Sequence, residues 1–293
     1  MAFARPIPSE TFRQFDRLAF VTRRAARAGA GGEHYARRPA PSTDFVDYRP
    51  YQPGDDFRRV DWNVYGRLGT LQVKVTEGRE RLNVLVVLDC SSSMAFGMPE
   101  KLEFGAHLAA ALAYVGMTRA DSVSIACLGA PARIGPFARR TRTAALVRQL
   151  SEIAPTGAVD VNRGLASCLA KDGTTPPLVV IVSDLLTATG VAEGLDELQA
   201  RRADVAVIHV VSPEEMDPNL TGELQLIDAE SGSAVELGVS LETLAAYRSR
   251  FATWLDERAG ECRARGIRYI RVRTDRPLAS VLLDDLRRAG LVR

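Results

Sequence analysis

Five short apolar runs alternate with helical patterns from residue 82 onward, and this alternation is the feature that most constrains the fold. The runs are NVLVVLD (83–89), SVSIACLG (122–129), PLVVIVSD (177–184), DVAVIHVV (204–211) and IRYIRV (267–272). Runs that are almost continuously apolar and β-branched are typical of strands buried on both faces of a parallel sheet. Strands that alternate with helices indicate βαβ units with right-handed crossovers. We therefore predict a doubly wound, mostly parallel α/β sheet.

The segments between these runs carry apolar residues at helical spacing. They are KLEFGAHLAAALAYVGM (101–117), TAALVRQLSEI (143–153), VNRGLASCLA (161–170), GVAEGLDELQARR (190–202) and SLETLAAYRSRFATWLDERAGECRARG (240–266). Ser240 is placed to cap the last of them. The first 81 residues differ, because they mix Arg, Gly, Pro and aromatic residues with weak periodicity.

This contrast predicts two parts, an N-terminal segment over 1–81 and an α/β domain over 82–293. A short helix over 9–27 is expected to open the N-terminal segment, followed by extended segments and turns. Within the domain, 212–240 alternates polar and apolar residues around the turn sequence AESGS. That pattern predicts a β-hairpin insertion.

Composition excludes several classes of function. Lys and Arg number 38 against 36 Asp and Glu, so the formal net charge is only +2 and predicts no general affinity for nucleic acid. An arginine cluster at Arg23, Arg24 and Arg27 leaves nucleic-acid binding as a weaker option. No stretch reaches the roughly eighteen apolar residues that a membrane span needs, and the N-terminus lacks a signal-peptide pattern. We expect a cytoplasmic protein.

The residue types needed for common catalysts are sparse. No phosphate-binding GxxxxGK[ST] loop and no GxSxG turn is present. The histidines are His34, His107 and His209, and the last two lie in a helical pattern and a strand pattern, where a packed core role is expected. The cysteines Cys90, Cys127, Cys168 and Cys262 form no CxxC pair, which argues against zinc and disulfides.

Polar residues follow two of the predicted strands directly. Asp89, Ser91 and Ser93 come after the first strand, and Asp184 ends the third. Ligands of doubly wound sheets bind beyond the carboxyl ends of the strands, so these side chains converge if the two strands are neighbours. Hard oxygen ligands with few carboxylates suit Mg²⁺ or Mn²⁺. The alternative is that Asp89 and the serines only cap the loop and helix that follow.

The same residues resemble a known site. LDCSSSM matches the Asp-x-Ser-x-Ser motif of the von Willebrand factor A fold, whose metal-ion-dependent adhesion site binds a divalent cation. IVSDLL is similar to that fold's later Asp-bearing loop, which implies Asp184 as a further metal ligand. The family pattern also has a Thr on a second loop, and here Val159 stands in that position, with Thr156 and Asp160 as nearby alternatives.

A longer block resembles the bacterial family called domain of unknown function 58. It runs from FVDYRPYQPGDDFRRVDW to VLDCSSSM, with a Pro-Gly-Asp-Asp turn, the Asp61–Trp62 pair, Arg67 and Glu80. The ending, RARGIRYIRVRTDRPLASVLLDDL, is also similar to that family. In this block, charged residues are expected to form ion pairs that clamp the N-terminal segment onto the sheet, with Trp62 and Tyr65 as packing residues, and a partner-binding role for the block is the alternative. The charged residues are Asp55, Asp56, Arg58, Arg59 and Asp61.

The sparse catalytic residues and the adhesion-type motif favour a non-enzymatic interaction module, and the family resemblance implies the kind of partner. Its partner would be a MoxR-type AAA+ ATPase, and the pair would act in the assembly or activation of other proteins. A partner's Asp or Glu would complete the coordination of the metal. A metal-dependent phosphate-ester hydrolase that uses the same crevice remains the alternative.

Overall fold

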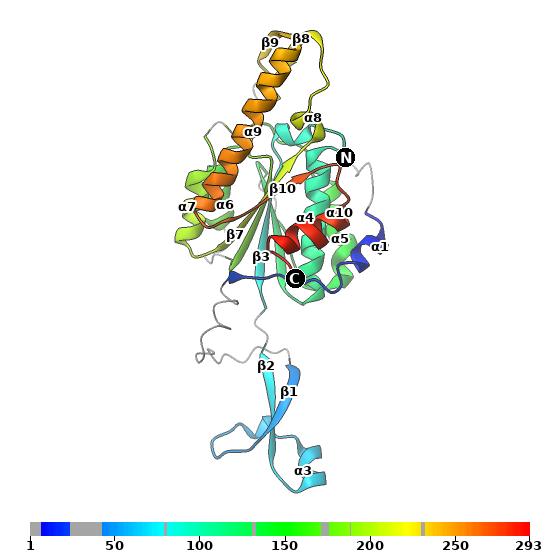
Figure 1. Cartoon of the computed structure of the whole chain (residues 1–293). Coiled ribbons are helices and arrows are strands. Elements are labelled where there is room, and N and C mark those ends of the chain that lie inside the picture. The colour runs from blue at the N-terminus through cyan, green and yellow to red at the C-terminus, as the bar shows by residue number, and fades with distance from the viewer. Residues whose placement is uncertain are drawn as a thin grey trace. The chain divides into compact units, whose positions relative to one another are not determined.

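The chain forms two compact units, one containing residues 1–30 and 82–293 and the other residues 31–81. Figure 1 shows the computed structural model, which describes residues 7–23, 43–78, 81–130, 133–170, 176–187, 189–229 and 232–293. The N-terminal segment predicted over 1–81 therefore contributes to both units. None of the helices in these described ranges is long and apolar enough to cross a membrane.

The larger unit is built on a six-stranded sheet with the order β10–β7–β6–β3–β4–β5. Its strands are β3 (Asn83–Asp89), β4 (Ser122–Leu128), β5 (Arg133–Phe137), β6 (Leu178–Ser183), β7 (Asp204–Val211) and β10 (Arg268–Arg273). All neighbours pair in parallel except β5, which is antiparallel to β4. The five predicted strands are confirmed. Strand β5 was missed because Gly135 and Pro136 interrupt its pattern.

Helices cover both faces of this sheet (Figure 1). The main ones are α4 (Lys101–Thr118), α5 (Thr143–Ser151), α6 (Val161–Ala170), α7 (Ala192–Ala200) and α9 (Leu241–Ala264). One apolar core holds residues of α4 and α5, and a second core on the opposite face holds residues of α6, α7 and α9. The predicted doubly wound sheet is confirmed, and the Ser240 side chain caps α9 by accepting from the Thr243 amide.

Strand β3 lies at the point where the strand order reverses. The chain leaves β3 through α4 to reach β4 on one side, and later returns through α5 and α6 to β6 on the other side. The loops after β3 and β6 therefore open the crevice at which doubly wound folds bind ligands.

The N-terminal residues 7–23 pack onto the larger unit. Helix α1 spans only Ser9–Arg13, so the prediction of a helix up to residue 27 is wrong over its described part. The chain turns after α1 because Phe12 and Phe15 enter the core, and Ala19 then exchanges backbone hydrogen bonds with Arg293.

Short elements complete the larger unit. They are η2 (Ser92–Ala95), η3 (Arg140–Arg142), α8 (Pro213–Met216), β8 (Gly222–Ile227), β9 (Ala234–Val239), α10 (Leu278–Ser280) and η4 (Val281–Leu286). The predicted hairpin insertion is confirmed by the antiparallel pairing of β8 with β9.

The described part of the smaller unit consists of two antiparallel strands, β1 (Thr43–Pro50) and β2 (Gln72–Gly78), joined by η1 (Phe57–Arg59) and helix α3 (Trp62–Leu68). The extended segments predicted for this region are thus paired strands. Glu80 lies outside the described residues.

Candidate functional site

The motif loop begins where β3 ends. The buried Asp89 carboxylate accepts one hydrogen bond from the Ser91 amide at 2.9 Å and another from the Ser183 hydroxyl at 2.5 Å. The Ser91 and Ser93 hydroxyl oxygens lie 2.9 Å apart. The spacing of two residues therefore turns three oxygen-bearing side chains to one side of a tight loop.

Strand β6 brings the second set of polar residues beside the first. Leu88 pairs with Val182, so Ser183 and Asp184 follow next to Asp89. Burial and the nearby Asp184 carboxylate raise the pKa of Asp89, while the Ser183 hydrogen bond lowers it. The convergence expected for adjacent strands is present.

Asp184 is held by a lysine that the sequence reasoning missed. The Lys101 ammonium, at the start of α4, lies 2.7 Å from the Asp184 carboxylate and also binds the Glu215 carboxylate of α8. Lys101 is completely buried. The available signal was a lysine that opens a largely apolar helix just after the motif, which is an unusual place for a charge. We call Lys101, Asp184 and Glu215 the buried triad.

An open cavity of about 530 Å³ adjoins the motif. Ser93, which is only partly buried, lines it together with the triad's Lys101 and Glu215. The other lining residues are Phe96, Leu186, Thr187, Asp228, Ala229 and Trp254. Ser93 therefore faces an open cavity with partly aromatic and aliphatic walls, whereas Asp89 and Ser91 are buried beneath it.

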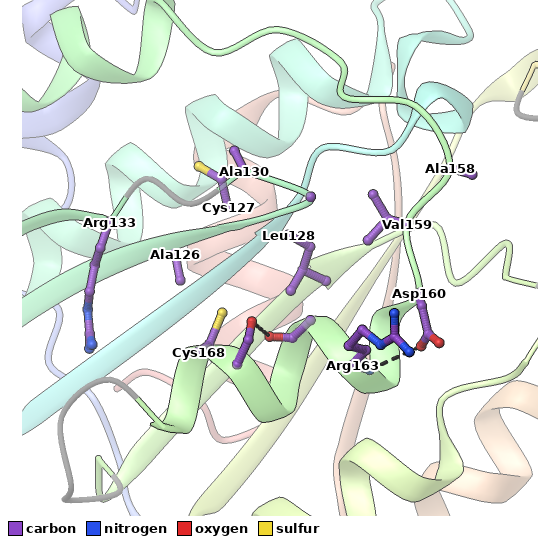
Figure 2. A pocket seen from close by; sticks show the side chains of 13 residues that line it. Ala126, Cys127, Leu128, Ala130, Arg133, Ala158, Val159, Asp160, Arg163 and Cys168 are labelled. Carbon is purple, nitrogen blue, oxygen red and sulfur yellow. Dashed lines mark hydrogen bonds between the residues drawn. The ribbon is translucent and has the colours of Figure 1, made fainter.

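The second loop gives the motif no threonine ligand at residue 159. Val159 is buried in the apolar core and lines another cavity, of about 570 Å³ (Figure 2). Asp160 lies beside Val159 there and accepts from the Arg163 amide at the start of α6. Thr156 lies against the motif instead, because its amide and hydroxyl both donate to the Cys90 carbonyl.

The loop contact of Thr156 depends on Gly129. With φ +84°, Gly129 lies where an added Cβ would be 2.1 Å from the Thr156 hydroxyl oxygen. Gly129→Ala should lower the free energy of unfolding by about 2–4 kcal/mol, since it combines backbone strain with overpacking. Gly157→Ala is the matched control, with φ +89° but open space around the Cβ, and should cost about 1–2 kcal/mol. If urea unfolding showed equal losses of stability for Gly129→Ala and Gly157→Ala, the predicted clash with Thr156 would be contradicted.

The side chains of the motif offer the kind of ligand atoms that a hard divalent cation prefers. Asp89, Ser91 and Ser93 supply oxygen atoms only, and Asp184 is a fourth oxygen residue that in this structure is paired with Lys101. Within the described ranges, no group of three or more His, Cys, Asp and Glu side chains is arranged to hold a metal. A zinc-type site is therefore not found there, whereas Mg²⁺ or Mn²⁺ accepts hydroxyl and water ligands beside a single carboxylate.

The described histidines are poor candidates for a general base. His209 is buried in β7, where its Nδ1 atom lies 2.7 Å from the Tyr269 hydroxyl, and burial lowers the pKa of His209 to about 3. Burial also lowers the pKa of His107 in α4. His34 lies outside the described residues.

The arginine cluster is only partly described. Arg23 donates from its side chain to the Gly266 carbonyl and from its amide to Asp204. Arg24 and Arg27 lie outside the described residues. Arg23 thus has a structural role, in anchoring the N-terminal segment.

Solved structures similar to this chain include BatB, a conserved hypothetical protein from Bacteroides thetaiotaomicron. It is 14% identical, with a TM-score of 0.43, and the match covers 71% of this chain and 98% of that one. Manganese-loaded TRAP from Plasmodium vivax is 15% identical, with a TM-score of 0.33, and the match covers 44% and 57%.

Sequence relatives extend over most of the chain. An uncharacterized protein of Mycobacterium tuberculosis, Rv1480, is 29% identical over 255 residues, which is 84% of this chain and 79% of the relative. An uncharacterized protein of Mycobacterium bovis, Mb1516, matches to the same extent. The family model described as "Protein of unknown function DUF58" matches residues 47–259. The chain therefore belongs to the DUF58 family.

Proposed function

We propose that this protein is a non-enzymatic protein-interaction module that binds its partner through a divalent cation. Asp89, Ser91 and Ser93 would hold Mg²⁺ or Mn²⁺, with Asp184 close enough to contribute. The observation that supports this most is the position of the three motif residues. They lie at the reversal point of the sheet and border an open cavity through Ser93.

The chemistry of the site favours binding over turnover. A cation held by one carboxylate and two hydroxyls keeps a net positive charge and can accept a carboxylate from outside. Asp89 and Ser91 are buried and fix the geometry, whereas Ser93 reaches the cavity from which a partner would approach. A partner's Asp or Glu is the matching group.

The partner we propose is a MoxR-type AAA+ ATPase, in the cytoplasm, acting with this protein in the assembly or activation of other proteins. This proposal rests on the family to which the chain belongs and on the adhesion-type motif. It assigns the energy-consuming step to the partner, since no ATP-binding loop motif occurs in this sequence.

Metal removal should be measurable without any partner. At a Mn²⁺ concentration about 100-fold above Kd, ligand linkage should stabilise the protein by about 2.7 kcal/mol and raise Tm by about 5 °C. EDTA should reverse this shift, and Asp89→Asn should abolish it. Asp160→Asn is the matched control, because Asp160 lies on a neighbouring loop and lines a different cavity. A shift retained in Asp89→Asn would contradict the assignment.

The partner is tested by affinity capture of tagged protein from its native lysate. Magnesium, excess EDTA and an Asp89→Ala variant are compared, and the bound proteins are identified by mass spectrometry. An AAA+ ATPase retained only with magnesium and intact Asp89 is the expected result. Retention under all three conditions would reject the metal bridge, and loss of every specific partner would reject the proposal.

A further inference from the structure

The Lys101 ammonium lies inside the protein, at the edge of the proposed metal site. Lys101 is completely buried, and its Nζ atom lies 2.7 Å from the Asp184 carboxylate. It also forms an ion pair with Glu215, and the centre of the Phe96 ring lies 5.8 Å from the Nζ atom. Burying a charged lysine is costly unless the charge is paired, so the two carboxylates hold the ammonium where it is.

The backbone on both sides of this ion pair is also held in place. The Lys101 amide donates to the Phe96 carbonyl at 3.1 Å, and Lys101 is the first residue of α4. Gly97, with φ +94°, packs so closely on Ser212 that an added Cβ would lie 2.5 Å from the Ser212 Cβ. Ser212 is the N-cap of α8, the helix that carries Glu215. The positions of the lysine and of Glu215 are therefore fixed by contacts of their own backbone segments.

Both oxygens of the Asp184 carboxylate are engaged. One accepts from the Leu186 amide at 3.1 Å, and the other accepts from Lys101. Ser183, the preceding residue, donates to the Asp89 carboxylate, so Asp184 lies next to the motif while its charge is paired with the lysine. A carboxylate that is paired with an ammonium attracts a second cation less strongly. Asp184 can therefore serve a divalent cation only in competition with Lys101.

Lys101 also changes the total charge near the motif. Asp89 and the buried triad together contain three carboxylates and one ammonium, so Lys101 offsets one of three formal negative charges. Charges interact more strongly in the interior of a protein than in water, and the affinity of an oxygen site for a divalent cation depends on the charge of its ligands. The same oxygen atoms would therefore bind a divalent cation more tightly without the lysine.

We propose that Lys101 sets the cation affinity of the site, because it competes with the divalent cation for Asp184 and keeps that affinity low. This inference rests on the proposed function, since it requires that the motif binds a cation. Glu215 has the opposite effect, because it shares the lysine and leaves more of the Asp184 charge available. A partner's carboxylate would restore the negative charge that Lys101 offsets, so the cation and the partner should bind cooperatively.

The alternative is that Lys101 only stabilises the fold. Both roles predict that its removal lowers the free energy of unfolding, since the two carboxylates lose their counter-ion in either case. Only competition for Asp184 predicts that the variant gains affinity for a divalent cation. The dissociation constant for Mn²⁺ therefore distinguishes the two roles, whereas stability alone does not.

The test measures the dissociation constant of the full chain for Mn²⁺ from the electron paramagnetic resonance signal of free Mn²⁺. Lys101→Met should bind Mn²⁺ about 10-fold more tightly than the unmodified protein, or tighter still. Glu215→Gln leaves the lysine to Asp184 alone and should bind Mn²⁺ several-fold more weakly. Circular dichroism checks that each variant is folded, and Glu215→Gln decides the question if Lys101→Met does not fold.

Two further comparisons show whether the lysine acts through Asp184. In an Asp184→Asn background, Lys101→Met should change the Mn²⁺ affinity by less than about 2-fold, since the two residues act as a coupled pair. Arg268→Met is the matched control, because it also removes the cation of a buried ion pair. That pair joins Arg268 at the start of β10 to Asp204 at the start of β7, at the opposite end of the parallel strands from the motif. Arg268→Met should leave the Mn²⁺ affinity unchanged.

The outcomes separate this inference from the proposed function. If the unmodified protein binds Mn²⁺ and Lys101→Met binds it no more tightly, or Glu215→Gln no more weakly, the competition is refuted and the metal-binding module stands. A gain that persists in the Asp184→Asn background would also refute it. If neither the unmodified protein nor Lys101→Met binds Mn²⁺, both proposals fail. If only Lys101→Met binds Mn²⁺, the competition is supported and the proposed function is rejected.

Discussion

Replacing Lys101 by methionine should lower the free energy of unfolding by about 3–5 kcal/mol, because it leaves two carboxylates without their counter-ion in the interior. Lys101 is 0% exposed and Asp184 is 2% exposed. Methionine has a side chain of similar length, so the decrease in the free energy of unfolding reports the removed charge more than a change in packed volume. Urea unfolding at neutral pH, followed by circular dichroism, gives the difference directly.

A variant in which all three members of the triad are uncharged distinguishes the effect of lost ion pairing from the effect of altered packing. The variant Lys101→Met with Asp184→Asn and Glu215→Gln should recover most of the loss, since replacing every member of a buried ion pair is often nearly neutral. The amide oxygens can still accept from the Leu186 and Ser212 amides, as the carboxylates do. Arg201→Met is the control, because it breaks an exposed pair and should cost under about 1 kcal/mol. If Lys101→Met lowered the free energy of unfolding as little as Arg201→Met does, a stabilising role of the buried triad would be refuted.

Arg268→Met should cause a second large loss, again of about 3–5 kcal/mol, because Arg268 joins three parts of the larger unit. Its guanidinium forms a buried ion pair with Asp204 and donates to the Val21 and Gly290 carbonyls at 2.8 and 2.7 Å. The variant therefore leaves a buried carboxylate without its ion pair and removes a donor from two carbonyls. Amide hydrogen exchange at Val21 and Arg293, which lie in the paired terminal segments, should accelerate.

Arg265→Met provides the comparison for Arg268. Arg265 pairs with Asp196 through two hydrogen bonds, but the aspartate is more than half exposed, so solvent screens the pair and its loss should lower the free energy of unfolding far less than Arg268→Met does. Unchanged exchange at Val21 in Arg268→Met would show that the terminal segments are held by their backbone bonds alone.

The Lys101 triad also lies near the proposed metal site. The same lysine that neutralises Asp184 begins α4, directly after the motif loop, and contacts α8 through Glu215. Glu215 closes the capping box of α8, and its carbonyl accepts from the Tyr247 hydroxyl of α9. The start of α4, α8 and α9 are therefore joined by one continuous set of polar contacts, of which Lys101 and Glu215 line the open cavity.

The architecture of the larger unit followed from the sequence because its signals are local. Continuous apolar strands indicate burial on both faces, and helical spacing between them indicates crossovers. The same logic placed Asp89, Ser91 and Ser93 at a strand end, where parallel strands bring loops together. The hairpin insertion followed from strict alternation around a turn. None of these inferences needs to know which distant residues touch.

Contacts between distant residues were decided only by the tertiary structure. Lys101 is 83 residues from Asp184 and 114 from Glu215, so no periodicity links them, and only the layering of α4 and α8 at the end of β6 brings them together. Trp62 and Tyr65 show the converse. Large aromatic side chains are usually at least partly buried, but these two lie on helix α3, in which no residue is buried. The local sequence determines which side chains tend to be buried, whereas the packing of helices on the sheet decides which distant residues each of them contacts.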